Sequence, residues 1–177
     1  MIQGDTIILR PVEKTDLERL VTWRNDPSIS KYFFNVFPLS MAGQWNWFED
    51  LLGREDKRLF IIDTTEKVPI GTVGLDNIDF KNQRAEFGSL LIQPSHQGKG
   101  FALDATMTLL RFAFDHLNLN RIYLQVFNWN KPAIKLYLRC GFQEEGLLRQ
   151  SVYKDGGFQD ILLMAVLRDE FKSSVIT

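Results

Sequence analysis

The sequence predicts an α/β fold of the α+β type, in which a mixed, mostly antiparallel sheet has helices on both faces. Two observations indicate this. Strand-like runs at 84–93 and 121–127 flank a helically spaced apolar segment at 102–116, so the two strands should be parallel neighbours. Two later runs, 146–153 and 159–166, are separated by Lys154-Asp155-Gly156-Gly157, a sequence typical of a hairpin turn between antiparallel strands.

The first half of the chain predicts further strands and helices before this β–α–β unit. Its first helix is amphipathic, and Asp26-Pro27 should end it. The expected elements are, in order, a strand at 5–12, helices at 14–25 and about 40–52, and strands at 59–63 and 70–75.

A short helix should follow the second parallel strand, over about 131–140. Asn130 is a good N-cap, Pro132 suits the first turn, and Gly141 suits the left-handed position after the last turn. Asn130 and Tyr137 are seven residues apart, so they lie on nearly the same face of this helix.

Composition limits the function classes. The 177 residues predict one domain, 1–177, and a net charge of −1 argues against a nucleic-acid-binding face. We expect no signal peptide and no membrane span. The single cysteine, Cys140, excludes an internal disulfide and fits a cytoplasmic protein. We expect the protein to be a monomer or a homodimer. His96 and His116 lack partners at metal-ligand spacing, so we expect no metal.

A glycine-rich turn, Gln97-Gly98-Lys99-Gly100-Phe101-Ala102, joins the end of the strand at 84–93 to the following helix. Backbone N–H groups and the helix dipole at such a turn favour an anion, and glycines let a phosphate approach the main chain. The turn is neither a P-loop nor a dinucleotide-binding fingerprint. The alternative is a loop that needs glycines only in order to turn.

This turn, followed by Asn-x-x-Ala-x-x-x-Tyr-x-x-x-Gly-Phe over 130–142, resembles the GNAT acetyltransferases. The resemblance covers nearly the whole chain. It extends to a branch that contains ribosomal-protein N-terminal acetyltransferases and spermidine acetyltransferases. The segments that resemble this branch are Ile7 to Val12, Asp16-Leu17, Arg84 to Phe87, and Tyr153 to Asp160.

The resemblance implies acetyl-CoA as cosubstrate and a splayed gap between the two parallel strands where the thioester enters. It places the pyrophosphate on the glycine-rich turn, the pantetheine along the end of the preceding strand, and a backbone N–H near Leu91 as donor to the developing oxyanion. The implied cofactor-binding residues are Leu91, Ile92, Gln93, Gln97, Gly98, Lys99, Gly100, Phe101, Ala102 and Asn130.

Tyr137 is the candidate general acid, because a phenol pKa of about 10 lies near that of an aliphatic thiol and suits proton donation to a leaving thiolate. The alternative is a core tyrosine that packs on Phe142.

Glu86 is the candidate acceptor of the amine proton, directly or through water. Its alternative is a structural partner of Arg84 or another arginine. Asp76 is a reserve candidate for ammonium recognition.

The family resemblance implies that an amine acceptor attacks acetyl-CoA directly in a ternary complex. It also implies that the first two helices and the late hairpin roof the acceptor site, although helically spaced aromatics also suit a core. The residues expected there are Trp23, Arg24, Asn25, Phe33, Phe34, Phe37, Trp45 and Trp47. A peptide or protein N-terminus is favoured. A polyamine is ranked lower because acids and bases are balanced. An aminosugar stays open because Trp23-Arg24-Asn25 is similar to a motif of aminosugar acetyltransferases. A non-catalytic acetyl-CoA sensor is the alternative of another class.

Overall fold

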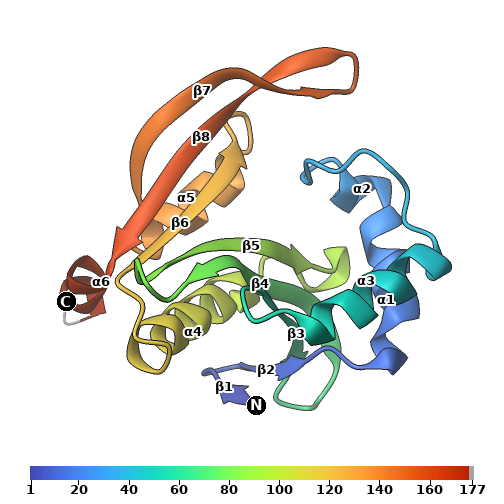
Figure 1. The fold of residues 1–177 in the computed structure, drawn as a ribbon, viewed down its shortest axis with the longest axis horizontal. Coiled ribbons are helices and arrows are strands. Elements are labelled where there is room, and N and C mark those ends of the chain that lie inside the picture. The colour runs from blue at the N-terminus through green and yellow to red at the C-terminus, as the bar shows by residue number, and fades with distance from the viewer. Residues whose placement is uncertain (176–177) are drawn as a thin grey trace.

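The computed structural model describes residues 1–175, with side chains up to Phe171. An eight-stranded sheet has the order β1-β2-β3-β4-β5-β6-β8-β7 (Figure 1). The strands are β1 (Ile2–Gln3), β2 (Ile7–Pro11), β3 (Arg58–Thr64), β4 (Pro69–Asp79), β5 (Arg84–Ile92), β6 (Arg121–Phe127), β7 (Gln143–Lys154) and β8 (Gly157–Leu167). The helices are η1 (Lys14–Asp16), α1 (Leu17–Asn25), α2 (Pro27–Ser30), α3 (Met41–Gly53), η2 (Pro94–His96), α4 (Phe101–Asp115), α5 (Lys131–Arg139) and α6 (Arg168–Val175).

Within residues 1–175, only β5 and β6 are parallel, and α4 connects them, while all other paired strands are antiparallel. This arrangement confirms the predicted mixed, mostly antiparallel sheet. The parallel pairing runs from Arg84 opposite Arg121 to Glu86 opposite Tyr123 and then stops. Beyond that point the two strands separate, as Figure 1 shows, and they leave the gap that the family resemblance implies.

Two hydrophobic cores cover the two faces of the sheet. One packs α4 and α5 on one face, and the other packs α1, α2 and α3 on the opposite face. Adjacent strand residues alternate between them: Leu91 belongs to the core under α1–α3, and Ile92 to the core under α4 and α5. Because Leu75 and Phe87 face α4 and α5, their neighbours Asp76 and Glu86 lie on the α1–α3 face.

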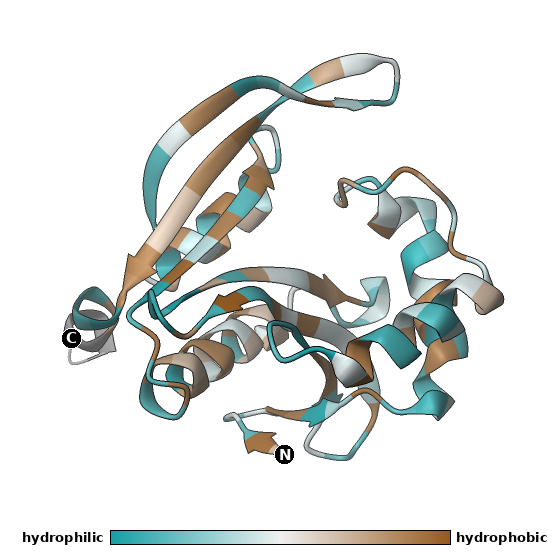
Figure 2. Cartoon of the chain, in the orientation of Figure 1, coloured by the Kyte–Doolittle hydropathy of each residue, from teal (hydrophilic) through white to brown (hydrophobic). Residues whose placement is uncertain are grey.

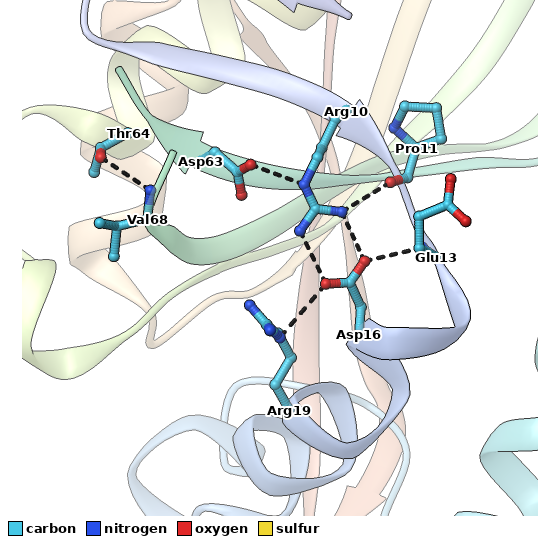
Figure 3. Close-up of polar contacts among 8 residues, drawn as sticks. All are labelled: Arg10, Pro11, Glu13, Asp16, Arg19, Asp63, Thr64 and Val68. Atoms are coloured by element: carbon cyan, nitrogen blue, oxygen red, sulfur yellow. Dashed lines mark hydrogen bonds and ion pairs between the residues drawn. The ribbon is translucent and has the colours of Figure 1, made fainter. Parts of the chain in front are cut away.

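A buried ionic network holds the first helices against the sheet (Figure 3). The guanidinium of Arg10 on β2 donates to both carboxylate oxygens of Asp16, at 2.7 and 2.9 Å, and to Asp63 at 2.8 Å. Although burial opposes ionisation of Asp16, which is 1% exposed, the bonds from Arg10 hold the pKa of Asp16 below its ordinary value. The network fixes where the chain leaves the sheet and enters α1.

The structure differs from the predicted elements in two places, where contacts between residues set the ends of a helix and of a strand. Pro27 ends α1, as predicted, but it also begins α2, because Asp26 accepts a hydrogen bond from the Ser28 N–H at 2.8 Å and caps a new turn. The strand predicted at 70–75 extends to Asp79 in β4, where Asp76 is the pairing partner of Glu86. This extension places a second carboxylate beside Glu86.

The β7–β8 hairpin extends beyond the rest of the sheet and faces α2 (Figure 1). β8 is mostly hydrophobic along its length, whereas β7 is mixed, as expected for an edge strand that is largely exposed (Figure 2). At the end of β7, the Lys154 ammonium donates to the backbone carbonyl of Ser30 at 3.0 Å. This bond connects the hairpin to α2.

Candidate active site

The gap between β5 and β6 opens into a cavity of about 670 Å³, here called the central cavity. Its wall combines β5, the glycine-rich turn, the start of α4, one face of α5 and the segment after α2. A volume in this range accommodates a cofactor or a drug-sized ligand, which typically needs about 300–1,000 Å³. The predicted site residues on its wall are Phe33, Phe34, Asp76, Glu86, Leu91, Ile92, Gln97, Gly98, Gly100, Phe101, Ala102, Asn130 and Tyr137.

The glycine-rich turn has the backbone that an anion site needs. Gly98 and Gly100 adopt φ values of 74° and 87°, and an added Cβ at either position would meet no protein atom within 4 Å. Gly100 is the N-cap of α4, which has fifteen residues, and Gln97 donates to the Ile92 carbonyl at 2.9 Å. The open space beside the first turn of a long helix therefore fits a phosphate group.

The end of β5 contains a β-bulge that sequence analysis missed. The register of β4 and β5 shifts between Thr72 and Gly74, and Ser89 adopts a φ of 55°. The Thr72 hydroxyl donates to the Ser89 carbonyl at 2.6 Å and holds this conformation. The bulge lies beside the cavity and next to Leu91, where the family resemblance implies backbone contacts with the pantetheine and the oxyanion. Gly88-Ser89, two small residues in an apolar strand, was the only available signal.

Tyr137 lies on the wall of the central cavity. Its ring makes edge contacts with Phe87 and Phe142, with centroids 5.9 and 5.7 Å apart. Burial, with a smaller contribution from Cys140, raises the pKa of Tyr137 above its ordinary value, so the phenol keeps its proton. Its hydroxyl makes no hydrogen bond within the described part of the chain. The ring is therefore fixed by packing while the hydroxyl stays available to a ligand.

Two carboxylates, Asp76 and Glu86, also lie on the wall of the central cavity. Glu86 accepts hydrogen bonds from Asn77 at 2.9 Å and from Gln125 at 3.3 Å. The expected alternative, a pair with Arg84 or another arginine, does not form among the described residues, and Arg84 contacts Asp79 at 3.6 Å instead. Asp76, directly opposite Glu86, pairs with Lys57 at 2.6 Å. Glu86 thus has neutral donors and no ion pair among the described residues.

The remaining predicted site residues lie elsewhere. Gln93 and Lys99 are adjacent to the central cavity in sequence but are not on its wall. Trp23 is buried in the core under α1–α3, at 7% exposure, because its position on α1 faces the sheet. Arg24 lines a second cavity, described below. Helical spacing alone did not distinguish a core tryptophan from an acceptor contact.

The aromatic wall on the acceptor side was identified only in part. Phe33 and Phe34 were predicted, and the structure adds Tyr32 from the same segment. Tyr32 packs on Trp129 at 5.7 Å, and Phe34 makes an edge contact with Phe127 at 4.9 Å. These contacts join the segment after α2 to the end of β6 and to the loop before α5, on one side of the cavity.

Cys140 has no place in the site. It is fully buried, and burial raises the pKa of its thiol to about 12. Within residues 1–175, no cluster of three or more histidine, cysteine or acidic side chains has the geometry of a metal site. No helix in the same range is long and apolar enough to cross a membrane.

The splayed parallel strands and the glycine-rich turn beside the central cavity are typical of an acyltransferase. Residues 6–143 match the acetyltransferase (GNAT) domain family. The chain belongs to this family, and it is an acetyl-CoA-dependent N-acetyltransferase.

Two relatives and one solved structure illustrate the branch. Spermidine N(1)-acetyltransferase of Vibrio cholerae is 33% identical over 165 residues, which cover 93% of this chain and 95% of that protein. A putative ribosomal N-acetyltransferase of Bacillus subtilis (strain 168) is 29% identical over 180 residues, covering 96% and 95%. The crystal structure of the Vibrio cholerae spermidine N-acetyltransferase in complex with CoA and spermine has a TM-score of 0.91 and 32% identity, covering 96% and 99%.

Proposed function

We propose that this enzyme acetylates a primary amine of an alkyl polyamine by direct attack on acetyl-CoA in a ternary complex. The observation that carries the proposal is the pairing of Asp76 with Glu86 across β4 and β5, on the wall of the central cavity. Like charges directly opposite each other on a sheet are destabilising. Their presence at a cavity fits a site that binds a cation.

A polyamine needs both parts of this arrangement. Its amines have pKa values near that of lysine, about 10.4, so they are largely protonated at neutral pH. The attacking amine must lose a proton, while another ammonium group must be held. Asp76 already has Lys57 as partner, whereas Glu86 receives only amide donors. Glu86 is therefore the carboxylate with more capacity to accept the proton of the attacking amine, and Asp76, which pairs with Lys57 through one oxygen, holds the other ammonium group.

The relatives support a polyamine better than the peptide N-terminus favoured from sequence. The structurally similar Vibrio cholerae enzyme binds CoA and spermine. The sequence argument against a polyamine used the overall balance of acids and bases. What matters for binding is where the acids lie, and the extension of β4 to Asp79 brings Asp76 opposite Glu86.

The reaction assigns one proton transfer to each candidate residue. The amine nitrogen attacks the thioester carbonyl carbon, the C–S bond breaks, and the amine proton passes to Glu86 directly or through water. Tyr137 donates a proton to the departing thiolate. Backbone N–H groups near Leu91 stabilise the oxyanion, and losing one such donor typically costs on the order of 3 kcal/mol in the barrier.

The test is release of CoA with a panel of acceptors: spermidine, a peptide with a free N-terminus, and glucosamine. Spermidine should have the highest kcat/KM. Asp76→Asn should raise the KM for spermidine by about tenfold, because one charge-assisted contact is lost, with a smaller effect on glucosamine. Glu144→Gln, which removes an exposed carboxylate from β7, is the matched control. A peptide with a higher kcat/KM than spermidine would overturn the proposal, as would an equal effect of Asp76→Asn on every acceptor.

A further inference from the structure

A second cavity of about 310 Å³, here called the hairpin cavity, lies between α1, the segment after α2 and the β7–β8 turn. It shares Phe33 with the central cavity, so the two are neighbours. Three cationic residues line it, namely Arg24, Lys31 and Lys154. Their surroundings show how these charges are compensated.

Arg24 is a partly buried cation without a carboxylate. Its guanidinium lies 3.9 Å from the centroid of the Phe33 ring, and burial lowers its pKa. Among the described residues it makes neither an ion pair nor a hydrogen bond. The planar fork of donors on this guanidinium is therefore free to bind a ligand.

Lys154 is more deeply buried, at 6% exposure. Its ammonium donates to the backbone carbonyls of Ser30 at 3.0 Å and Phe33 at 2.5 Å. An ammonium group has three N–H donors, so these two bonds leave one available. No carboxylate lies within ion-pair distance of Lys154 in the described part of the chain. Carbonyl oxygens solvate the charge, but they do not neutralise it.

The nearby carboxylates do not balance these cations. The sequence contains no aspartate or glutamate from residue 27 to residue 48. Asp26 is engaged as the N-cap of α2, where it accepts from the Ser28 N–H and hydroxyl. Asp155 lines the cavity but is exposed at the hairpin turn. The net charge of the lining is therefore positive.

We propose that the hairpin cavity binds an oxyanion, a phosphate or carboxylate group. Buried charges are normally paired with an opposite charge. Arg24 and Lys154 have no carboxylate partner, so their position favours the binding of an anion. Arg24 offers two parallel N–H donors, which match a phosphate or carboxylate, and Lys154 and Lys31 add point charges. The same cations repel a polyamine. The inference goes beyond the proposed function, because it does not depend on which amine the enzyme acetylates.

The anion has two possible sources with the same chemistry. It is either a free ligand that occupies the cavity beside the acceptor, or an acidic group on an acceptor whose amine reaches the central cavity past Phe33. Both sources use the same donors.

The test measures the binding of inorganic phosphate by titration calorimetry to the full enzyme saturated with CoA, so that the glycine-rich turn is filled. Phosphate should bind, and Arg24→Gln should weaken its binding by at least about tenfold. Arg24→Lys, which keeps the charge but loses the fork, should weaken it less. Arg149→Gln, which removes an exposed cation from β7, is the matched control and should change nothing. Melting temperatures check that each variant is folded.

Absence of phosphate binding to the CoA-saturated enzyme would overturn the proposal, and so would equal binding by wild type and Arg24→Gln. Because this titration measures no acetylation, a negative result is distinct from failure of the polyamine assignment.

A kinetic measurement identifies the source of the anion. If the acceptor carries the anion, glucosamine 6-phosphate has a lower KM than glucosamine, and Arg24→Gln removes the difference. If the anion is a free ligand, the two sugars have the same KM and phosphate still binds.

Discussion

The central cavity and the hairpin cavity share Phe33 but have opposite charge. The wall of the first contains Asp76 and Glu86, and the wall of the second contains Arg24 and Lys154. A net charge of −1 for the whole chain shows nothing of this separation. The comparison teaches that recognition depends on where charges are placed, and that one enzyme can offer neighbouring sites for a cation and an anion.

The two cavities are also built from different parts of the fold. The carboxylates of the central cavity lie on adjacent strands of the sheet, whose hydrogen-bonded register fixes their separation. The cations of the hairpin cavity come from α1 and from a hairpin more than a hundred residues later, joined by the contact between Lys154 and Ser30. The central cavity should therefore tolerate changes in the hairpin cavity, and the following predictions test this separation.

Removing the hydroxyl of Tyr137 should have the largest effect. Tyr137→Phe keeps the ring contacts with Phe87 and Phe142, and the lost hydroxyl has no hydrogen-bond partner among the described residues. The fold should survive while single-turnover acetylation falls by roughly 10²–10⁴, the usual contribution of a general acid. Acetyl-CoA affinity should change by less than about 1.5 kcal/mol, the value of one neutral hydrogen bond.

The pH profile sharpens this prediction. An acid must be protonated to act, and burial raises the pKa of Tyr137 above its ordinary value of about 10. Wild-type turnover should therefore show no decline attributable to Tyr137 as pH rises from 6 to about 10. Normal turnover in Tyr137→Phe would instead identify a core tyrosine. Phosphate binding in the hairpin cavity should be unchanged in this variant.

Sequence analysis identified the local features of the site, and it failed where distant segments meet. The glycine-rich turn, the N-cap Asn130 and the parallel strands depend on neighbouring residues, so composition and spacing were sufficient. The bulge at Ser89 depends on a hydrogen bond from Thr72 on another strand. Trp23 could face either the core or a ligand, and only the packing of α1 on the sheet places it in the core.

Neutralising Glu86 should have the next largest effect. Glu86→Gln keeps the size of the side chain, but its amide oxygen no longer accepts a proton from the amine. We expect turnover with spermidine to fall by about 10², the lower end of the range for a general base. Acetyl-CoA affinity, measured by calorimetry, is the internal control and should stay nearly intact. Full turnover with the best acceptor would show that water alone removes the proton.

Filling the glycine-rich turn should weaken cofactor binding. Gly100→Val places a branched side chain where the structure is open and where φ is 87°. Acetyl-CoA binding should weaken by more than about tenfold, or about 1.4 kcal/mol. Gly156→Val in the hairpin turn is a matched control for backbone strain, because Gly156 has a φ of 83° and equally open surroundings. Equal acetyl-CoA affinity in both folded variants would show that the pyrophosphate does not bind at this turn.

Removing the ammonium of Lys154 should have the smallest effect on turnover. Lys154→Met keeps the length of the side chain, but it removes the donor to the Phe33 carbonyl, whereas the Ser30 carbonyl still accepts from the Phe33 N–H at 3.1 Å. The cost is about 1–3 kcal/mol in the free energy of unfolding, the penalty of one unsatisfied carbonyl in a partly buried place. Turnover with spermidine should change by less than about threefold, because Asp76 and Glu86 of the central cavity lie on the sheet and are unaffected.

The exposed cation of the same cavity provides the control for this variant. Lys31→Met removes a charge without removing a bond to the backbone, so its melting temperature should stay close to that of wild type. If Lys154→Met lowers turnover as strongly as Glu86→Gln while remaining folded, then the hairpin cavity acts directly in the acetylation step. The separation of the two cavities would then be wrong, and the cations around Phe33 would belong to the acceptor site itself.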